Sequence, residues 1–343
     1  MKRLKKIFIK NNATIYKYIN KNRFVRKFLI LFKIALIYFL LFYKYFDVSF
    51  VNSLCNLFIH RQSKIKEFYD NKISIFTFWE PSTNVPGYIQ LCVDTWKKNL
   101  PNSNIIILDY SNLHKYLNSS IISKILFKKM TLPIQADAIR VAILEKYGGI
   151  WMDIDIIIID YRFLKDVFRY DLVFFGNPQE KDPAIGFIYA SKNSRIMKEW
   201  LTNIIKKVSL YKEFYFGNYK KKGELSNLYM WNYLGNGIIN KILQKAKEKE
   251  FIIFDWIKKN AIPERNIFHF EGKTGFKKAY NKLYFYPGNP QKIIYNNSGI
   301  IFLHNSWTDK KYQYMSKIQF LKQNILLSSL LKLLLKKKLN YIL

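Results

Sequence analysis

A helical segment that ends at two consecutive glycines and leads directly into an apolar strand is the strongest constraint on how this chain folds. Residues 134–147 carry apolar side chains at helical spacing, and Pro133 suits a first helical position. Gly148 and Gly149 end this helix, and the run from Ile150 to Ile159 is too apolar to lie on the surface. We therefore expect a helix packed against a central, buried strand.

Strand-like and helical patterns alternate along the chain from about residue 73. We expect strands over residues 73–78, 105–108, 172–175, 186–190, 251–254 and 300–303. Helices are expected over residues 86–99, 194–208 and 227–245, with two short ones within 113–130. This alternation predicts the α/β class, with a mostly parallel central sheet covered by helices on both faces.

The N-terminal part of the chain differs from this alternating pattern. Residues 1–71 form a basic, helical-looking leader, which contains the apolar run Phe28–Tyr43. Lys33 interrupts that run, and a comfortable membrane span needs about 20 residues. We expect the leader to associate with a membrane, and the sequence leaves open whether it spans it.

The C-terminal part also stands apart from the central domain, which we place at residues 72–310. Residues 311–343 end in the leucine-rich segment Ile325–Leu343, which carries a late cluster of lysines. An amphipathic helix of this kind can lie on an anionic membrane surface with its leucines buried. The alternative is that its leucines pack on the central domain as ordinary core.

The charge and the cysteines set broad limits on partners and compartment. The 343 residues include 57 Lys and Arg against 24 Asp and Glu, a formal charge of +33. This excess favours anionic partners such as nucleic acid, acidic lipid or phosphorylated substrates, without choosing among them. The only cysteines, Cys55 and Cys92, have neither zinc-site nor disulfide-framework spacing, which favours a reducing compartment.

Two aspartates within the apolar run are the best candidates for chemistry. In an extended segment, Asp153 and Asp155 project to the same side. Their carboxylates suit Mg²⁺ or Mn²⁺, which takes its remaining ligands from water and substrate phosphates and can neutralise a diphosphate leaving group. On the preceding helix, Asp137 and Arg140 are three residues apart and share a face. Asp109, directly after a strand, either contacts a ribose or begins a turn.

These residues lie in a block that closely resembles a known signature. The block reads Gln135-Ala-Asp-Ala-Ile-Arg-Val-Ala-Ile-Leu-Glu-Lys-Tyr-Gly-Gly-Ile-Trp-Met-Asp-Ile-Asp155. It resembles that of glycosyltransferase family 32 and related bacterial capsular polysaccharide synthesis proteins. Similar pieces occur at Ile75–Glu80, Asp94–Lys97 and His304–Trp307, so the resemblance covers about residues 73–307.

The resemblance implies a nucleotide-sugar fold of the GT-A type and a reaction that retains the configuration of the donor sugar. Asp153 and Asp155 would bind the metal, with His304 near the metal and phosphates. Asp137 and Arg140 would hold hydroxyls of the donor sugar.

The resemblance also implies roles at the nucleotide end of the site. Trp79 would lie where the base binds, and Ser306 and Trp307 would form a closing element over the diphosphate. Two positions depart from the family pattern: Ile185 replaces an Asn before Gly-Phe, and Gly235 begins only a weak match to a Gly-Pro loop.

The expected function is a Mn²⁺- or Mg²⁺-dependent glycosyltransferase that uses a nucleotide-sugar donor and a saccharide acceptor, which can be lipid-linked. We expect it at the cytoplasmic face of the cell membrane, peripheral or anchored by the leader, and without a nucleic-acid partner. The alternatives are a basic nucleic-acid-binding protein, a glycoside hydrolase, whose two carboxylates must flank the sugar, and an inactive transferase-like scaffold.

Overall fold

The computed structural model describes residues 73–216, 232–268, 272–296 and 299–336. Contacts divide the chain into two units, residues 1–62 and 63–343, and every described residue belongs to the second. The apolar run Phe28–Tyr43 lies outside the described residues.

Six strands form the central sheet in the order β2-β1-β3-β6-β5-β7, and β6 alone runs antiparallel to the rest. Their bounds are β1 Ser74–Phe78, β2 Asn104–Leu108, β3 Gly149–Met152, β5 Leu172–Asn177, β6 Asp182–Ala190 and β7 Ile252–Asp255. The expected mostly parallel α/β sheet is confirmed. A second, two-stranded sheet pairs β4 Ile156–Ile158 with β8 Ile300–Phe302.

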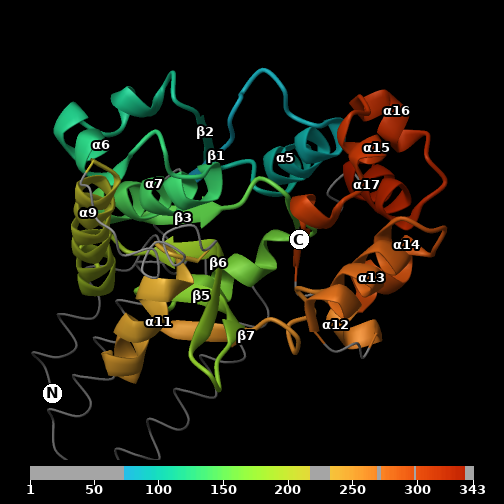
Figure 1. The fold of residues 1–343 in the computed structure, drawn as a ribbon. Coiled ribbons are helices and arrows are strands. Elements are labelled where there is room, and N and C mark those ends of the chain that lie inside the picture. Colours follow the sequence, from blue (N-terminus) through green and yellow to red (C-terminus); the bar gives the residue numbers. More distant parts are fainter. Residues whose placement is uncertain (1–72, 217–231, 269–271, 297–298, 337–343) are drawn as a thin grey trace, which may run out of the picture. The chain divides into compact units, whose positions relative to one another are not determined.

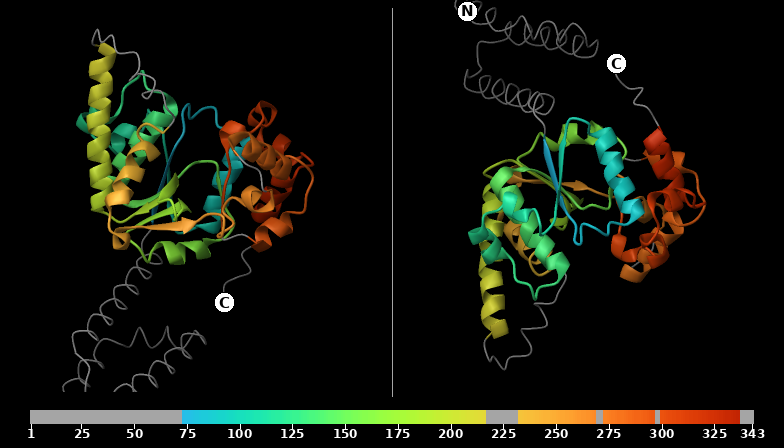
Figure 2. Two further views of the ribbon diagram at one scale, coloured as in Figure 1. Left: turned by 60° about the horizontal axis from the view of Figure 1, so that its bottom comes forward. Right: turned by 90° about the horizontal axis from the view of Figure 1, so that it is seen from above.

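Helices cover both faces of the six-stranded sheet (Figures 1 and 2). One face packs against α6 Ser119–Ile125, α7 Leu132–Tyr147, α9 Arg195–Phe216 and α11 Asn236–Lys245. On the other face, α5 Gly87–Asn99 shares a core with the sheet, and α16 Lys317–Leu321 and α17 Leu326–Lys336 pack against α5. α13 Gly272–Tyr284 and α14 Pro290–Asn296 pack against α17. The remaining short helices are η1 Leu113–Lys115, η2 Tyr161–Phe163, α8 Leu164–Val167, η3 Glu248–Glu250, α12 Pro263–Ile267, η4 Asn305–Trp307 and α15 Lys310–Gln313.

Alternation along the strands explains the two cores. Successive side chains of a strand point to opposite faces of the sheet. In β3, Ile150 therefore lies in the core with α5 and α17, while its neighbour Trp151 lies in the core with α7 and α9. Both side chains are buried. The sequence reads as continuously apolar because both faces are covered.

The expected single strand from Ile150 to Ile159 is wrong. β3 ends at Met152, and the amide of Ile156 donates to the carbonyl of Asp153 (3.1 Å), which closes a turn before β4. The chain thus leaves the central sheet at the two aspartates and continues in the second sheet. Side-chain alternation along one strand consequently does not apply to Asp153 and Asp155.

The C-terminal helix α17 packs on the domain. This is the alternative given above for the leucine-rich segment, in which its leucines form ordinary core. Its buried leucines belong to the same core as β3 and α5; they are Leu326, Leu327, Leu330, Leu331 and Leu334. This face of α17 is therefore not free to enter a membrane. In the described part of the chain, no helix is both long and apolar enough to cross a bilayer.

Candidate active site

The connection between α7 and β3 sets the position of the site. α7 ends at Gly148 (φ 66°) and Gly149 (φ 94°), backbone conformations that residues with a Cβ rarely adopt. A Cβ on Gly149 would also lie 2.7 Å from the carbonyl oxygen of Ser74 in β1. The two glycines let the chain turn tightly from helix to strand, so that α7 lies beside the end of β3.

A buried arginine joins the helix to the turn. Nη2 of Arg140 donates to Oδ1 of Asp153 (2.8 Å), and Nη1 lies 3.0 Å from Oδ1 of Asp137. Nε1 of Trp151 donates to the same Asp153 oxygen (2.9 Å), and the guanidinium lies over the Trp151 ring at 5.1 Å. Arg140 and Asp137 are nearly enclosed, whereas the Asp153 side chain is 41% exposed. The arrangement holds one carboxylate oxygen of Asp153 and leaves the other for a ligand.

Asp137 is an unusual buried carboxyl. Burial raises its pKa to about 7, the charge of Asp153 acts in the same direction, and Arg140 opposes both. The ion pair with Arg140 favours the ionised carboxylate, but the enclosed position outweighs it, so the pKa of Asp137 is raised.

Asp155 connects the turn to the segment after β8. Its Oδ2 accepts a hydrogen bond from the amide of Asn305 (2.8 Å). Burial raises the pKa of Asp155 to about 6, and the nearby Asp153 carboxylate adds to the rise, while the Asn305 amide and His304 oppose it. The mutual repulsion of two carboxylates in one turn is a condition that a bound cation relieves.

His304 lies in this segment among aromatic rings. Its ring lies 4.0 Å from that of Trp307 and meets Tyr280 edge to face at 5.5 Å. Nε2 of His304 is 3.5 Å from Oε1 of the buried Glu264, without a hydrogen bond between them. Ser306, on the same turn, is exposed. The predicted group His304, Ser306 and Trp307 therefore lies beside the Asp155 end of the site.

Several buried polar atoms around these residues lack a hydrogen bond. Among described residues, five buried side-chain nitrogen or oxygen atoms lack a hydrogen-bond partner. Four of them belong to the site: Nε and Nη1 of Arg140, Nε2 of His304 and Oε1 of Glu264. Three of these four atoms nevertheless lie at ion-pair distance from another group of the site, because Nη1 of Arg140 is 3.0 Å from Asp137 and Nε2 of His304 is 3.5 Å from Oε1 of Glu264.

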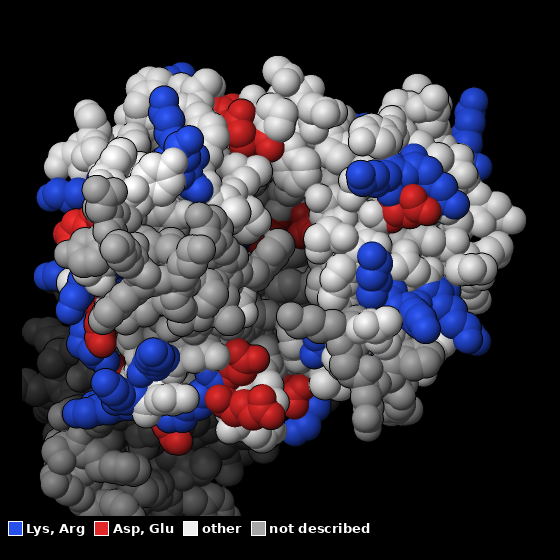
Figure 3. Space-filling view, viewed as in Figure 1, with Lys and Arg blue, Asp and Glu red and all other residues white. Residues whose placement is uncertain are grey.

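Two glycines leave space beside the acidic residues. A Cβ on Gly186 in β6 would lie 2.9 Å from Oδ2 of Asp153, and one on Gly235 would lie 2.5 Å from Oδ2 of Asp137. The same added atom on Gly235 would lie 2.5 Å from Cδ1 of Ile185. In Figure 3 a hollow in this face contains acidic side-chain atoms, while most of the surrounding lysines and arginines lie on the outer surface.

Trp79 and Asp109 lie together at the ends of β1 and β2. The amide of Trp79 donates to the carbonyl of Leu108 (3.0 Å). Oδ1 of Asp109 accepts from Oγ of Ser111 (2.6 Å) and from the amide of Asn112 (2.9 Å), so it begins a turn. These hydrogen bonds, that to Ser111 foremost, lower the pKa of Asp109. Its contact with a ribose stays a prediction.

The site includes residues that sequence reasoning missed. Glu264 is not part of a recognisable sequence motif. Asn305 acts through its backbone amide, for which the sequence carries no signal. Trp151 could have been found, because it lies two residues before Asp153. For Gly235 the sequence carries only a weak match to a loop.

A divalent cation fits the acidic turn. Within the described ranges no group of three or more His, Cys, Asp or Glu side chains is arranged to hold a metal ion. Mg²⁺ and Mn²⁺ sites, however, often use one or two carboxylates and complete their coordination with water and phosphate oxygens. Asp153 and Asp155 match this donor set, and Gly186 keeps the space at Oδ2 of Asp153 clear.

Comparisons with known proteins identify a family for residues 42–341. The family described as "Capsular polysaccharide synthesis protein" matches residues 42–341. No curated protein sequence matches significantly. Among solved structures, "PaToxG Glycosyltransferase" is similar over 56% of this chain and 79% of its own, with 19% identity and a TM-score of 0.32. That structural likeness is too weak to carry an inference about activity.

Proposed function

We propose that the chain, which belongs to the capsular polysaccharide synthesis protein family, transfers a sugar from a nucleotide-diphosphate sugar to a saccharide acceptor. The observation that carries the proposal is the cluster of charged groups around the turn after β3, where Nη2 of Arg140 donates to Asp153 (2.8 Å) and the Asn305 amide, next to His304, donates to Asp155 (2.8 Å). Donors and acceptors of both charges in one place suit a ligand that carries hydroxyl groups and phosphates together. The sheet, with β6 alone antiparallel, supports a fold of the GT-A type.

Each residue of the site has a proposed role. Asp153 and Asp155 would hold a Mg²⁺ or Mn²⁺ ion, with His304 beside the diphosphate. The ion would supply Lewis-acid stabilisation of the departing diphosphate. Arg140 would orient Asp153 and, with Asp137, bind hydroxyls of the donor sugar. Trp79, Asp109, Ser306 and Trp307 would surround the nucleotide.

The proposed donor and metal can be tested by thermal shift. Each nucleotide-sugar is added to the full chain with and without Mn²⁺. At 100 times its Kd, a ligand that binds only the native state stabilises it by about 2.7 kcal/mol. We expect one base and sugar to raise the melting temperature, with a larger rise when Mn²⁺ is present. The proposal fails if no nucleotide-sugar shifts the transition in either condition.

We also propose that the reaction retains the configuration of the donor's anomeric carbon, an expectation that rests on the family resemblance. No side chain of the described site is assigned as a nucleophile, and the departing diphosphate would help to deprotonate the acceptor hydroxyl. NMR of freshly formed product should show the same anomeric configuration as in the donor. An inverted centre in the first product molecules would refute retention and leave the proposed transfer intact.

The proposed location is the cytoplasmic face of the membrane, where a lipid-linked acceptor is accessible. Its support is the N-terminal apolar run, which lies outside the described residues. The leucine face of α17 no longer supports it, because that face is buried in the domain.

A further inference from the structure

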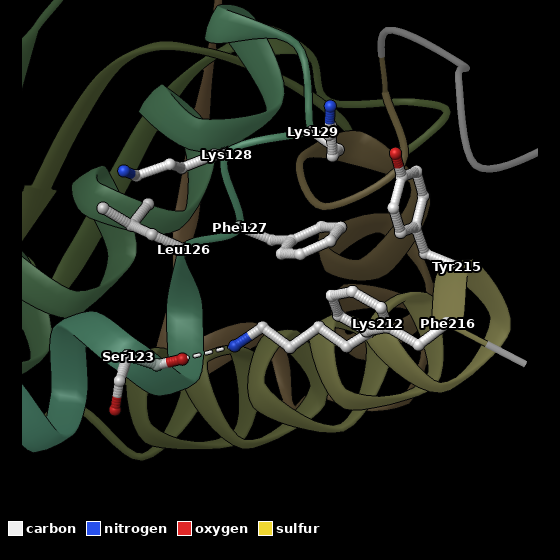
Figure 4. A pocket seen from close by; sticks show the side chains of 8 residues that line it. All are labelled: Ser123, Leu126, Phe127, Lys128, Lys129, Lys212, Tyr215 and Phe216. Carbon is white, nitrogen blue, oxygen red and sulfur yellow. Dashed lines mark hydrogen bonds between the residues drawn. The ribbon is translucent and has the colours of Figure 1, made fainter.

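A second concave site lies where the C-terminal end of α9 meets the segment after α6. The pocket has a volume of about 480 Å³, within the usual range for small-ligand sites. Its walls include Phe127, Tyr215 and Phe216, together with Lys129 and Lys212 (Figure 4). None of these five residues belongs to the proposed transfer site.

The aromatic rings of this pocket are grouped but not enclosed. Phe127 meets the rings of Tyr215 and Phe216 edge to face, with centroids 5.3 and 5.6 Å apart. Phe216 is 76% exposed and Tyr215 is 45% exposed. A group of large rings that keeps so much area in water contributes little to the core. Such grouped, accessible rings are typical of a binding surface.

Positive charge borders the rings. Lys212 extends across from α9 and donates to the carbonyl oxygen of Ser123, and Nζ of Lys129 lies 5.9 Å from the centre of the Tyr215 ring. Lys128 also lines the pocket but points away from the rings in Figure 4. Among the described residues, the lining contains no acidic side chain. The nearby Glu213 lies outside it and accepts a hydrogen bond from Ser209. The pocket therefore favours a ligand with both an apolar face and negative charge.

The pocket is within reach of the proposed transfer site. Lys129 precedes α7 by three residues, and Asp137 lies five residues into that helix. With a rise of 1.5 Å per helical residue and at most about 3.6 Å per extended residue, their Cα atoms are separated by no more than about 18 Å. A chain of a few sugar units can bridge such a distance.

We propose that this pocket is a subsite for an acidic saccharide, which places its acceptor end at the transfer site; this assignment rests on the proposed function. The aromatic rings cover the apolar faces of sugar rings. The ammonium groups of Lys129 and Lys212 form charge-assisted hydrogen bonds with carboxylates or phosphates of the saccharide. The acceptor class is thus an anionic glycan.

The shape of the pocket favours a saccharide over a membrane surface. Insertion into a bilayer interface needs apolar side chains on a surface that can enter the headgroup region. Here the rings and the lysines line a hollow, and the amine of Lys212 is turned back to the Ser123 carbonyl. A flexible saccharide chain can follow this hollow, with its apolar faces on the rings and its charges beside the lysines.

The test is calorimetric binding of a hexamer of galacturonic acid to the full chain at 0.15 M salt, with neutral maltohexaose as the reference. The test variant is Lys212→Ala/Phe216→Ala. The matched control is Lys292→Ala/Tyr295→Ala, which removes an exposed lysine and an exposed tyrosine from α14. We expect the acidic hexamer to bind at least ~10-fold more weakly to the test variant and unchanged to the control. Maltohexaose should bind more weakly than the acidic hexamer to the unchanged protein and to the control variant, and this difference should shrink in the test variant.

Several results would overturn the subsite. One is equal hexamer affinity in both variants; another is hexamer binding that only the control variant loses. In the third, the test variant loses binding to phosphatidylglycerol vesicles but keeps its affinity for the hexamer. That result would assign the pocket to a membrane. If the hexamer result is as expected but no nucleotide-sugar shifts the melting temperature, the subsite stands as a saccharide site and the proposed transfer fails.

Discussion

Asp153→Asn and Asp155→Asn are each expected to lower sugar transfer by roughly 10²–10³-fold while the protein stays folded. The loss follows because a neutral amide stabilises a bound cation, and through it the charge of the leaving diphosphate, far less than a carboxylate does. The fold should persist because an amide oxygen can still accept from Arg140 at position 153 and from the Asn305 amide at position 155. Turnover with the identified donor and Mn²⁺ is measured beside the melting temperature.

A contrast and a control sharpen this expectation. Asp137→Asn should also impair transfer, but it should leave the affinity for Mn²⁺ and nucleotide diphosphate intact, because Asp137 is assigned to the sugar. Asp166→Asn removes a half-exposed carboxylate on α8 that pairs with Arg169, and it should change nothing. If Asp153→Asn and Asp155→Asn retain full activity, the acidic turn is not the metal site. Equal losses of nucleotide-diphosphate affinity in all three site variants would refute the division of roles.

Local patterns were sufficient to predict α7 and its junction with β3. Apolar spacing, a proline near the start and two glycines at the end each have a local physical cause, and all agree with the structure. The class of fold followed from the alternation of such segments. The antiparallel direction of β6 was not predicted, since periodicity carries no information about strand direction.

The turn between β3 and β4 was hidden by composition. Six isoleucines lie between residues 150 and 159, so the run reads as one buried strand. The backbone instead turns at Asp153, and β4 pairs with β8 from the far end of the domain. That pairing depends on contacts between residues more than 140 positions apart, and no local pattern encodes it.

Contacts between distant parts of the chain also determine the part of the site around Asp155 and His304. Asp137, Arg140 and Asp153 lie within one short block, so their proximity could be inferred from a helix that runs into a strand. Glu264 and Asn305 reach the site only through folding of the chain, and the family resemblance pointed to the region of His304 without revealing its buried carboxylate neighbour.

Leu330→Ala is expected to destabilise the protein by about 2–5 kcal/mol, the usual loss for a fully buried leucine. Leu330 is enclosed in the core that joins α17 to α5 and β3. Two hydrogen bonds also hold this helix, because Nζ of Lys98 donates to the Leu334 carbonyl (2.7 Å) and the Leu326 amide donates to the Tyr286 carbonyl (2.7 Å). The melting temperature should fall by roughly 5–15 °C. Leu333→Ala, at a half-buried position of the same helix, should lower it much less.

The same two variants separate the alternatives for the C-terminal leucines. If α17 is part of the core, its leucines do not contribute to flotation of the full chain with anionic vesicles. Leu330→Ala then leaves flotation unchanged at a temperature where the variant is folded. A membrane-bound α17 would give the opposite pair of results: an unchanged melting temperature in solution and a loss of flotation. Because a leucine side chain cannot be buried in the domain and in lipid at once, the two measurements together decide where this face of the helix lies.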